Sequence, residues 1–396
     1  MGCVRSVCRS VSGSLLDYED DHIHLHKSIE REDSEAMENN AMSDLISKTI
    51  ANIEPTDSAC REAAIEHISR LTMPPWALGR LLDVAVDLAG MTRSMEPPTT
   101  QRTAVVVAGD HGVVAEGVSA FPQEVTVQMV HNFVNGGAGI NVLAQQAGAV
   151  VVVVDAGVAG DLSDLVEEKL IVNKRVAPGT SNMAKGPAMS REQAVRSVEA
   201  GIEVALDLAN QTDLFATGDM GIGNTTPSSA IVSVLCDMPS ETVTGCGTGI
   251  DEPARRQKAD TISKAITLNK PDPSDALDVL AKVGGFEIGT IAGLILAAAS
   301  RRKPILVDGF ISTAGALIAQ GLCPISTDYM LAAHQSLEQG HAIALKKLDK
   351  QPLLNLDLRL GEGTGAVLCM HIVDAGVRVM TQMATFDDAG VSESAS

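Results

Sequence analysis

The sequence predicts an α/β fold: a mostly parallel sheet with helices on both faces, plus a small helical domain. The chain alternates short apolar runs, glycine-rich turns and amphipathic stretches, which indicates repeated strand, turn and helix. Hydrophobic residues make up 45% of the chain but aromatic residues only 2%, so aliphatic side chains must fill the core, as under parallel strands. A length of 396 residues favours more than one domain, although one large α/β unit is compatible with it.

The formal charge of −20 argues against a nucleic-acid or anionic-membrane partner, because both require a basic surface. Any bound phosphate must therefore be held locally, by backbone amides and a few side chains. The seven cysteines are scattered without a CxxC pair, which suits a reducing, cytoplasmic location. We expect no membrane span, because the most apolar segment, residues 288–300, is too short.

Residues 1–41 carry four basic and nine acidic side chains with little apolar periodicity, so we expect a disordered N-terminal extension. The start, Met1-Gly2-Cys3-Val4-Arg5-Ser6, fits the N-myristoylation pattern. So short a pattern arises easily by chance, and we do not expect lipidation. The alternating His22, His24 and His26 are not expected to bind a metal, because nothing rigid would fix them.

The remaining chain divides into three predicted parts. Residues 42–98 have helical periodicity, broken at Pro74-Pro75, and form the N-terminal part of the small domain. Residues 99–345 form the α/β domain. Residues 346–396 supply a loop and a helix that join the small domain and end in a frayed tail. Within the α/β domain we expect strands at 103–108, 149–154, 214–217 and 304–309, and helices at 123–147, 191–210, 227–235, 275–283, 288–300 and 311–319.

Two glycine turns lie between predicted strands and helices. In the first, Gly218, Gly221 and Gly223 precede Asn224 and Thr225 at a helix start, where free amides and hydroxyls can hold a phosphate or a carboxylate. No Lys-Ser/Thr follows, so this is not a Walker loop, and a merely structural tight turn remains an alternative. The second turn spans 245–251. Two further turns, at 109–112 and 155–157, follow the first two predicted strands. Because ligands bind outside the carboxyl ends of parallel strands, we expect all these turns to line one cleft.

The segment Leu360-Gly361-Glu362-Gly363 sets one carboxylate between glycines, directly before an apolar helical run. Glycine leaves the backbone free to adopt positive φ and lets a ligand approach closely. Glu362 is therefore predicted near a helix N-terminus. Taken alone, a capping loop explains this pattern equally well.

Several blocks in order resemble the nicotinate-nucleotide:dimethylbenzimidazole phosphoribosyltransferase family. They span about residues 70 to 385, and a series of this length is more specific than any single motif. The blocks are Pro74-Pro75 with Leu78-Gly79-Arg80-Leu81, Asp110-His111-Gly112-Val113 with Glu116-Gly117-Val118, Gly186-Pro187-Ala188-Met189-Ser190-Arg191, Met220-Gly221-Ile222-Gly223-Asn224-Thr225-Thr226, Lys282-Val283-Gly284-Gly285-Phe286-Glu287, Val307-Asp308-Gly309-Phe310 and Arg359-Leu360-Gly361-Glu362-Gly363.

The resemblance implies transfer of phosphoribose from nicotinate mononucleotide to a benzimidazole, with release of nicotinate and inversion at the anomeric carbon. It also implies a Rossmann-like large domain, no cofactor, no metal and a homodimer whose partner helps to close each site. The implied catalytic residues are Glu362 as the base, Asp219 and Lys258. The implied mononucleotide positions are Gly221, Gly223, Asn224, Thr225, Gly247, Ser336 and Gly361, and the implied benzimidazole pocket is Phe121, Met129 and Leu360.

The chemistry is consistent with this resemblance. As one benzimidazole nitrogen attacks C1′, the N–H of the other becomes acidic, and a carboxylate can accept its proton. The chain departs from the family at Asp219, where Glu is usual, and at Trp76-Ala77 and Cys246. Phe121 and Met129 favour an apolar base. We expect His111 to hold its turn by hydrogen bonding rather than to act in catalysis.

Two alternatives remain open at this point. A hydrolase of nicotinate mononucleotide, or an enzyme with another aromatic acceptor, would fit the shorter Asp219 and the apolar Phe121. A non-catalytic nucleotide-binding subunit would keep the glycine turns but would not need Glu362.

Overall fold

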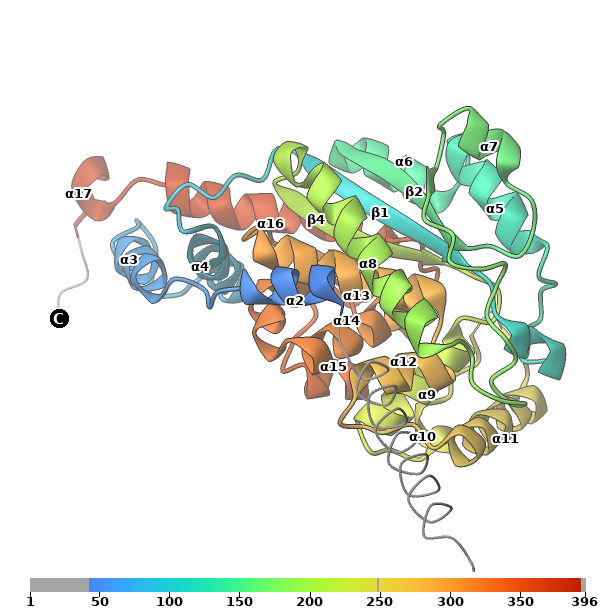
Figure 1. Ribbon diagram of the computed structural model, residues 1–396. Coiled ribbons are helices and arrows are strands. Elements are labelled where there is room, and N and C mark those ends of the chain that lie inside the picture. The colour runs from blue at the N-terminus through green and yellow to red at the C-terminus, as the bar shows by residue number, and fades with distance from the viewer. Residues whose placement is uncertain (1–42, 248, 393–396) are drawn as a thin grey trace, which may run out of the picture. The chain divides into compact units, whose positions relative to one another are not determined.

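A six-stranded sheet in which every strand pairs in parallel forms the centre of the molecule (Figure 1). The strand order β3-β2-β1-β4-β5-β6 is that of the dinucleotide-binding α/β folds. The predicted Rossmann-like parallel sheet is therefore confirmed. Its strands are β1 (Arg102–Gly109), β2 (Ala149–Gly157), β3 (Val172–Asn173), β4 (Leu214–Met220), β5 (Ile305–Val307) and β6 (Met330–Ala332).

This computed structural model describes residues 43–247 and 249–392, and those from Asp44 onward form one compact unit. The expectations for residues 1–41, including the lipidation pattern and the three histidines, lie outside the described residues. The helices are α2 (Asp44–Ala51), α3 (Ser58–Ser69), α4 (Arg80–Thr92), α5 (Val125–Val134), α6 (Gly139–Ala147), α7 (Ser163–Glu167), α8 (Arg191–Leu208), α9 (Thr225–Leu235), α10 (Ser240–Val243), α11 (Glu252–Asn269), α12 (Ala276–Val283), α13 (Phe286–Ser300), α14 (Phe310–Leu322), α15 (Gln339–Lys347), α16 (Thr364–Gln382) and α17 (Phe386–Ala389), with 3₁₀ turns η1 (Gly112–Glu116), η2 (Ala209–Gln211) and η3 (Pro324–Tyr329).

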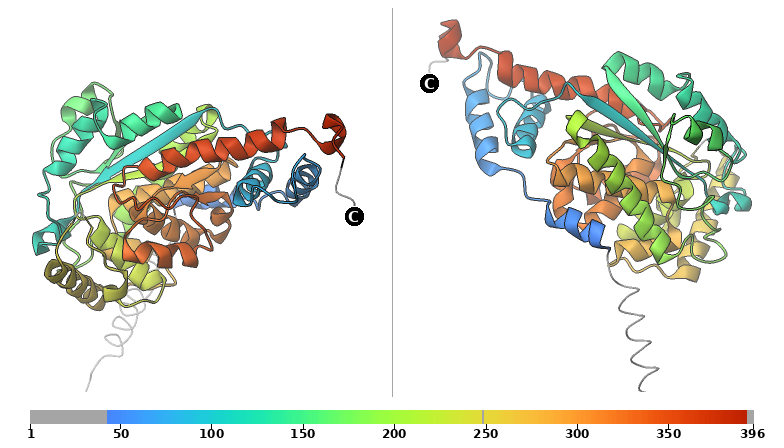
Figure 2. Two further views of the ribbon diagram at one scale, coloured as in Figure 1. Left: turned by 180° about the vertical axis from the view of Figure 1, so that it is seen from behind. Right: turned by 45° about the horizontal axis from the view of Figure 1, so that its top comes forward.

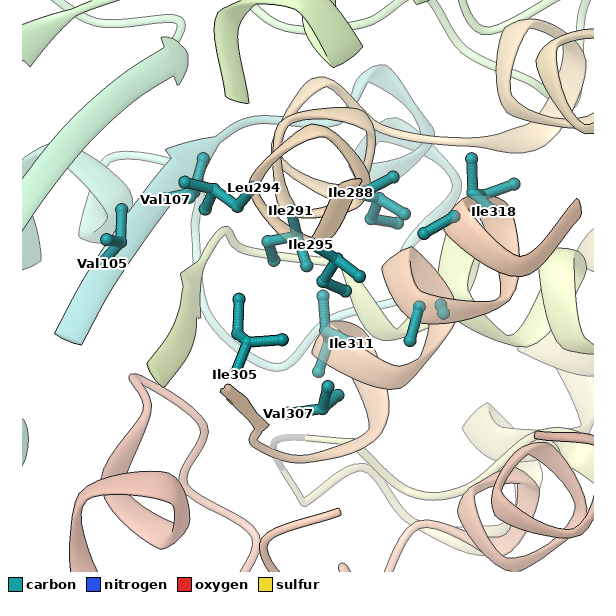
Figure 3. Close-up of a cluster of buried hydrophobic side chains, with 14 of the residues drawn as sticks. Val105, Val107, Ile288, Ile291, Leu294, Ile295, Ile305, Val307, Ile311 and Ile318 are labelled. Carbon is teal, nitrogen blue, oxygen red and sulfur yellow. The ribbon is translucent and has the colours of Figure 1, made fainter. Parts of the chain in front are cut away.

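Helices cover both faces of the sheet, as predicted. Helices α13 and α14 pack on one face, and α8 packs outside α13 (Figures 1 and 2). Helices α6 and α16 pack together on the opposite side, with α6 against β2 and α16 against β4 and β5. Figure 3 shows the aliphatic core between the sheet and α13, where Val107, Ile291, Leu294 and Ile305 meet. The low aromatic content thus corresponds to a core of branched aliphatic side chains.

Three sequence predictions were wrong in detail. The expected helix 123–147 is two helices, α5 and α6, because Gly136 adopts a positive φ of 75° between them. Helix α9 begins at Thr225, two residues earlier than expected, and Gly218 still belongs to β4. The strands β3 and β6 and the helix α15 were not predicted. Strands of two or three residues carry too little periodicity to be recognised.

A second, smaller hydrophobic cluster involves α3, α4 and the C-terminal end of α16. It contains Ala64, Ile68, Leu82, Ala85 and Met380, contributed by segments from both ends of the chain. This agrees with the expected small helical domain, whereas α2 packs on α13 and α8 of the larger part. The domain boundaries themselves stay a prediction.

Within the described ranges, α16 alone is long and apolar enough to cross a membrane by length and composition. More than half of it is buried in this structure, as in a core helix of a globular domain. The segment singled out from the sequence is α13, which has every residue from Phe286 to Ala299 buried.

Candidate active site

A cavity of about 350 Å³ opens at the carboxyl ends of β4, β5 and β6. In parallel α/β sheets this edge is where ligands bind. Its wall consists of Phe121, Val125, Met129, Asp219, Met220, Gly221, Ile222, Asn224, Thr225, Gly247, Gly309, Phe310, Ile311, His334, Ser336, Glu338, Arg359, Leu360, Gly361 and Glu362.

The loop before α16 presents Glu362 to this cavity in an unusual backbone conformation. Gly361, Glu362 and Gly363 have φ values of 81°, 63° and 91° in succession. A left-handed conformation is costly for a residue with a Cβ and persists only where the surroundings enforce it. The enforcement comes from β4: Glu362 N donates to Asp219 O at 3.2 Å, and a Cβ on Gly218 would lie 2.4 Å from Glu362 O. The strand and the loop therefore touch backbone to backbone.

Glu362 is 5% exposed, and among the described residues its carboxylate has one hydrogen bond, from Ile140 N to Oε2 at 3.2 Å. Ile140 lies in the first turn of α6, where amides are free to bind an anion. Burial raises the pKa of Glu362, partly offset by this amide. A carboxylate with a raised pKa is a stronger base, as proton abstraction requires.

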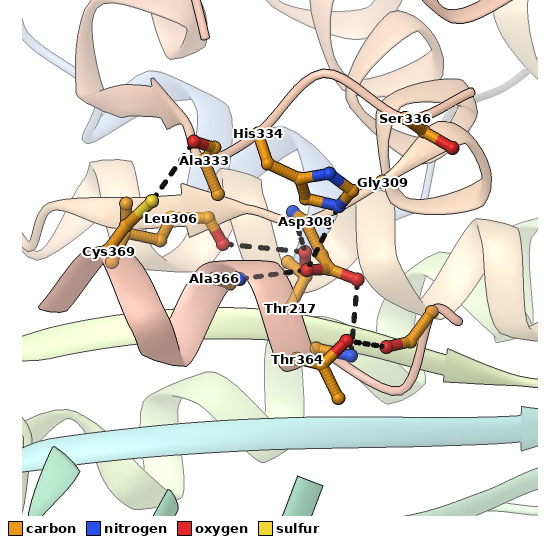
Figure 4. Close-up of polar contacts among 12 residues, drawn as sticks. Thr217, Leu306, Asp308, Gly309, Ala333, His334, Ser336, Thr364, Ala366 and Cys369 are labelled. Atoms are coloured by element: carbon orange, nitrogen blue, oxygen red, sulfur yellow. Dashed lines mark hydrogen bonds and ion pairs between the residues drawn. The ribbon is translucent and has the colours of Figure 1, made fainter. Parts of the chain in front are cut away.

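Asp308, at the end of β5, holds the start of α16 in place. Its two carboxylate oxygens accept hydrogen bonds from Gly363 N at 3.2 Å and Ala366 N at 2.8 Å (Figure 4). His334 Nε2 lies 3.6 Å from Asp308 Oδ1. Burial raises the pKa of Asp308, against His334 and the amides. A carboxylate aimed at a helix N-terminus stabilises it, so Asp308 fixes the helix that follows Glu362.

Asp219 lies at the end of β4, and its carboxyl group has one unfilled acceptor. Asn224 Nδ2 donates to Oδ2 at 3.0 Å, whereas Oδ1 is buried without a hydrogen-bond partner among the described residues. Burial, followed by the charges of Asp308, Glu287 and Glu362, raises the pKa of Asp219 well above its ordinary value. This buried acid is a candidate contact for a hydrogen-bond donor or a cationic group of a ligand.

Lys258 is nearly fully buried behind the glycine turn and does not itself line the cavity. Its Nζ donates to Thr225 Oγ1 at 2.6 Å, and Thr225 does line the cavity. Burial lowers the pKa of Lys258 to about 8, opposed by Glu338. The ammonium thus stands behind the first turn of α9, where it reinforces the helix N-terminus as an anion site.

One wall of the cavity is apolar. Phe121, Val125 and Met129 follow one another at a spacing of four residues and face the cavity together with Leu360. Phe121 is 49% exposed and Leu360 60% exposed, so this wall continues to the cavity mouth. An aromatic, weakly polar ligand fits such a wall.

The structure brings most of the predicted site residues to one cavity, from segments as distant as Phe121 and Glu362. Gly223 and Lys258 lie behind the wall. The expectation that all the glycine turns line one cleft was wrong for the turns after β1 and β2, which are absent from this wall. Sequence reasoning missed His334 and Glu338, which carried no motif, and Arg359 and Gly309, although both lie inside blocks that carried the family resemblance.

His111 occupies the turn after β1 and is 1% exposed. Its Nε2 lies 2.9 Å from Glu287 Oε1, at the start of α13. Burial disfavours the imidazolium, but Glu287 and Asp110 outweigh it and raise the pKa of His111. The contact joins a strand end to a helix start, and neither residue lines the cavity. Because His111 Nε2 has no hydrogen bond among the described residues, the expected hydrogen bonding within its turn stays a prediction.

The parallel sheet, the N-terminus of α9 and the buried carboxylate at one cavity together define an α/β enzyme that acts on a small molecule. Residues 53–391 match the model of the family described as Phosphoribosyltransferase, and the chain belongs to that family.

Similar proteins are found among both curated sequences and solved structures. One named nicotinate-nucleotide–dimethylbenzimidazole phosphoribosyltransferase, from Syntrophotalea carbinolica, is 62% identical over 88% of this chain and 99% of its own length. One of the same name, from Desulfotalea psychrophila, is 53% identical over 88% and 98%. The crystal structure of an enzyme with this name from Thermus thermophilus is 44% identical, with a TM-score of 0.81 over 85% of this chain and all of that chain.

Proposed function

We propose that this chain transfers phosphoribose from nicotinate mononucleotide to 5,6-dimethylbenzimidazole or a related aromatic base. The products are α-ribazole 5′-phosphate and nicotinate, in the assembly of the lower-ligand nucleotide of cobalamin. The observation that carries the proposal is that one cavity combines a buried carboxylate, Glu362, with the N-terminus of α9 at Thr225 and an apolar wall at Phe121 and Met129.

Glu362 acts as the base in this proposal. One benzimidazole nitrogen attacks C1′ of the ribose while the bond to the nicotinate nitrogen breaks, and the opposite ring N–H becomes acidic. Glu362 accepts that proton. Its raised pKa supports this role, since a buried carboxylate binds a proton more readily than an exposed glutamate does.

Asp219 assists by electrostatics. Positive charge develops on the sugar ring as the bond to nicotinate breaks, and a buried carboxylate with an unfilled acceptor stabilises such charge. The same carboxylate attracts the pyridinium ring of the substrate. Loss of nicotinate removes that ring charge.

The phosphate is held at the start of α9 in this proposal. The turn at Gly221 and Gly223 leads to the start of α9, where Asn224 N donates to Gly221 O at 3.2 Å. The Thr225 amide has no such bond among the described residues, and the Lys258 ammonium lies behind Thr225. Ser336, Gly247 and Gly361 complete the surroundings of the mononucleotide, and Leu360 those of the base. The protein's net charge of −20 makes this local cation important for binding an anion.

The active form is proposed to be a cytoplasmic homodimer. The exposed Phe121 and Leu360 at the cavity mouth leave an apolar rim that a partner subunit would cover. Unpaired cysteines, such as Cys236 and Cys323, are compatible with a reducing compartment. Sedimentation velocity of the full chain tests the dimer, and a monomer at micromolar concentration would contradict it.

The function is tested by mixing the purified full chain with nicotinate mononucleotide and 5,6-dimethylbenzimidazole and separating the products by chromatography. α-Ribazole phosphate and nicotinate should form in equal amounts. Nicotinate and free ribose phosphate without α-ribazole phosphate would instead identify a hydrolase. Stoichiometric binding of the mononucleotide without turnover would identify a non-catalytic subunit.

A further inference from the structure

A carboxylate at the cavity wall, Glu338, has no assigned role and an incomplete set of hydrogen bonds. Glu338 is 9% exposed, and its Oε2 is buried without a hydrogen-bond partner among the described residues. Burying an unpaired carboxylate is unfavourable, so a buried acceptor of this kind in a ligand cavity calls for a donor from the ligand.

The backbone of Glu338 is fixed on both sides. Its N–H donates to Ser336 Oγ at 3.3 Å, and its carbonyl oxygen accepts from His341 N at 3.0 Å. His341 Nδ1 in turn accepts from Ser336 N at 2.8 Å, and the opposite ring nitrogen lies 2.9 Å from Thr313 Oγ1. Because Nδ1 is an acceptor, the proton of the neutral ring is on Nε2, which donates to Thr313. The position of Glu338 is therefore rigid although one of its carboxylate oxygens lacks a partner.

Lys258 does not satisfy this carboxylate. It acts on Glu338 electrostatically, but no ion pair within 4.0 Å joins the two among the described residues. Oε2 of Glu338 packs against the main chain of Gly245, where a Cβ would lie only 2.1 Å from it, so glycine is required at this position. Burial raises the pKa of Glu338, with Lys258 and the Gly247 amide opposing it.

We propose that Glu338 accepts hydrogen bonds from the 2′ and 3′ hydroxyls of the substrate ribose and so selects a ribosyl over a deoxyribosyl donor. This inference rests on the proposed function. The mononucleotide offers few neutral hydrogen-bond donors, and its vicinal diol is the pair that suits a carboxylate. The phosphate and the nicotinate carboxylate carry negative charge and would be repelled by Glu338, so they belong at Thr225 and elsewhere in the cavity. Glu338 is then a specificity-determining residue distinct from the base.

The test compares nicotinate mononucleotide with its 2′-deoxy and 3′-deoxy analogues, using wild type, Glu338→Gln and Glu338→Ala. Wild type should prefer the ribosyl substrate over at least one analogue by about 10- to 100-fold in kcat/KM, the loss expected for one hydrogen bond to a charged acceptor. In Glu338→Ala, the ratio of kcat/KM values should fall to within about twofold of the ratio that the intrinsic reactivities of the substrates give. Glu338→Gln should show a preference between those of Glu338→Ala and wild type. Glu241→Gln, at an exposed glutamate outside the cavity wall, is the matched control.

Discrimination that is unchanged in Glu338→Ala, or absent from wild type, would overturn the inference. If Glu338 served only as a charge neighbour of Lys258, its variants would weaken all three substrates equally and shift the pH dependence of KM. Should wild type make no α-ribazole phosphate, the proposed function fails, and calorimetric affinities for the same three mononucleotides still test Glu338. Circular dichroism verifies that each variant is folded. If Glu338→Ala does not fold, Glu338→Gln is used for the comparison instead.

Discussion

The main-chain nitrogen of Ile140 lies 3.2 Å from Glu362 Oε2 and donates a hydrogen bond to it. The contact joins the N-terminal turn of α6, a helix that packs against β2, to the loop before α16. The two segments are more than 200 positions apart in the chain. One carboxylate oxygen is thereby held, while the other has no hydrogen bond among the described residues. A base that is oriented at one oxygen and open at the other is suited to receive a proton from a bound ring.

Replacement of Glu362 by Gln should separate chemistry from binding. Gln retains the shape and the acceptor for Ile140 N but cannot take up a proton, so we expect kcat to fall by about 10²- to 10⁴-fold. Nicotinate mononucleotide should bind with a Kd within about threefold of wild type, measured by calorimetry. Unchanged turnover would remove Glu362 from the role of base.

The dependence of activity on pH above neutrality should reflect the deprotonation of Lys258. The pKa of Lys258 is lowered to about 8, so the ammonium is present below pH 8 and is lost above it. We expect KM for the mononucleotide to rise as pH increases through about 8, and Lys258→Met to raise KM at pH 7 and remove this pH dependence. Thr225→Val keeps the ammonium and should keep this pH dependence. A pH dependence that survives in Lys258→Met would belong to another group.

Asp219 should reduce stability while supporting activity. Its folded-state pKa is raised, so its ionisation opposes folding, and stability is lost as pH rises from about 4 through the raised value. Asp219→Asn keeps the acceptor for Asn224 without charge, and we expect a Tm at pH 7.5 higher by about 2 °C or more, with lower kcat. Asp260→Asn, at an exposed aspartate, is the control. A lower Tm in Asp219→Asn would contradict the repulsion argued here.

The reverse change in length is informative at the same position. The family resemblance described above implies Glu at the position of Asp219, which lines the cavity, so Asp219→Glu should be tolerated or increase kcat/KM. A large loss, in steady-state kinetics with both substrates, would show that the shorter side chain is matched to this cavity. Misplacement of a catalytic group by about 1 Å can cost on the order of 100-fold.

His341 should make the protein less stable in acid. Burial lowers its pKa from 6.5 to about 3, so the unfolded chain binds a proton between these values and the folded protein does not. Lowering the pH from 7.5 to 5.5, which is one unit below the pKa of histidine in the unfolded chain, should reduce the free energy of unfolding by about 1.4 kcal/mol. Urea unfolding at the two pH values measures it. His341→Gln should reduce the pH dependence, and His371→Gln, at an exposed histidine, should not.

The sequence was sufficient for the parallel sheet, because Val-rich runs such as 103–108 and 149–154 indicate strands without further information. The run 103–108 is buried on both faces, whereas Val150 in the second run is exposed. It also located Glu362 at a helix start, since flanking glycines and the apolar periodicity after them are local signals. Glu338 and His334 could not be recognised this way. Their importance comes from burial without partners and from proximity to Gly245 and Asp308, which only the folded chain establishes.

Helix α16 begins at the Glu362 loop and carries Met380 of the second hydrophobic cluster near its other end. Over its 19 residues it acts as a rigid rod about 28 Å long. Loosening of the α3 and α4 helices would therefore tilt the rod and move the carboxylate at its far end, although none of those helices lines the cavity. Substitutions at remote positions such as Ile68 or Leu82 should thus impair catalysis by displacing Glu362.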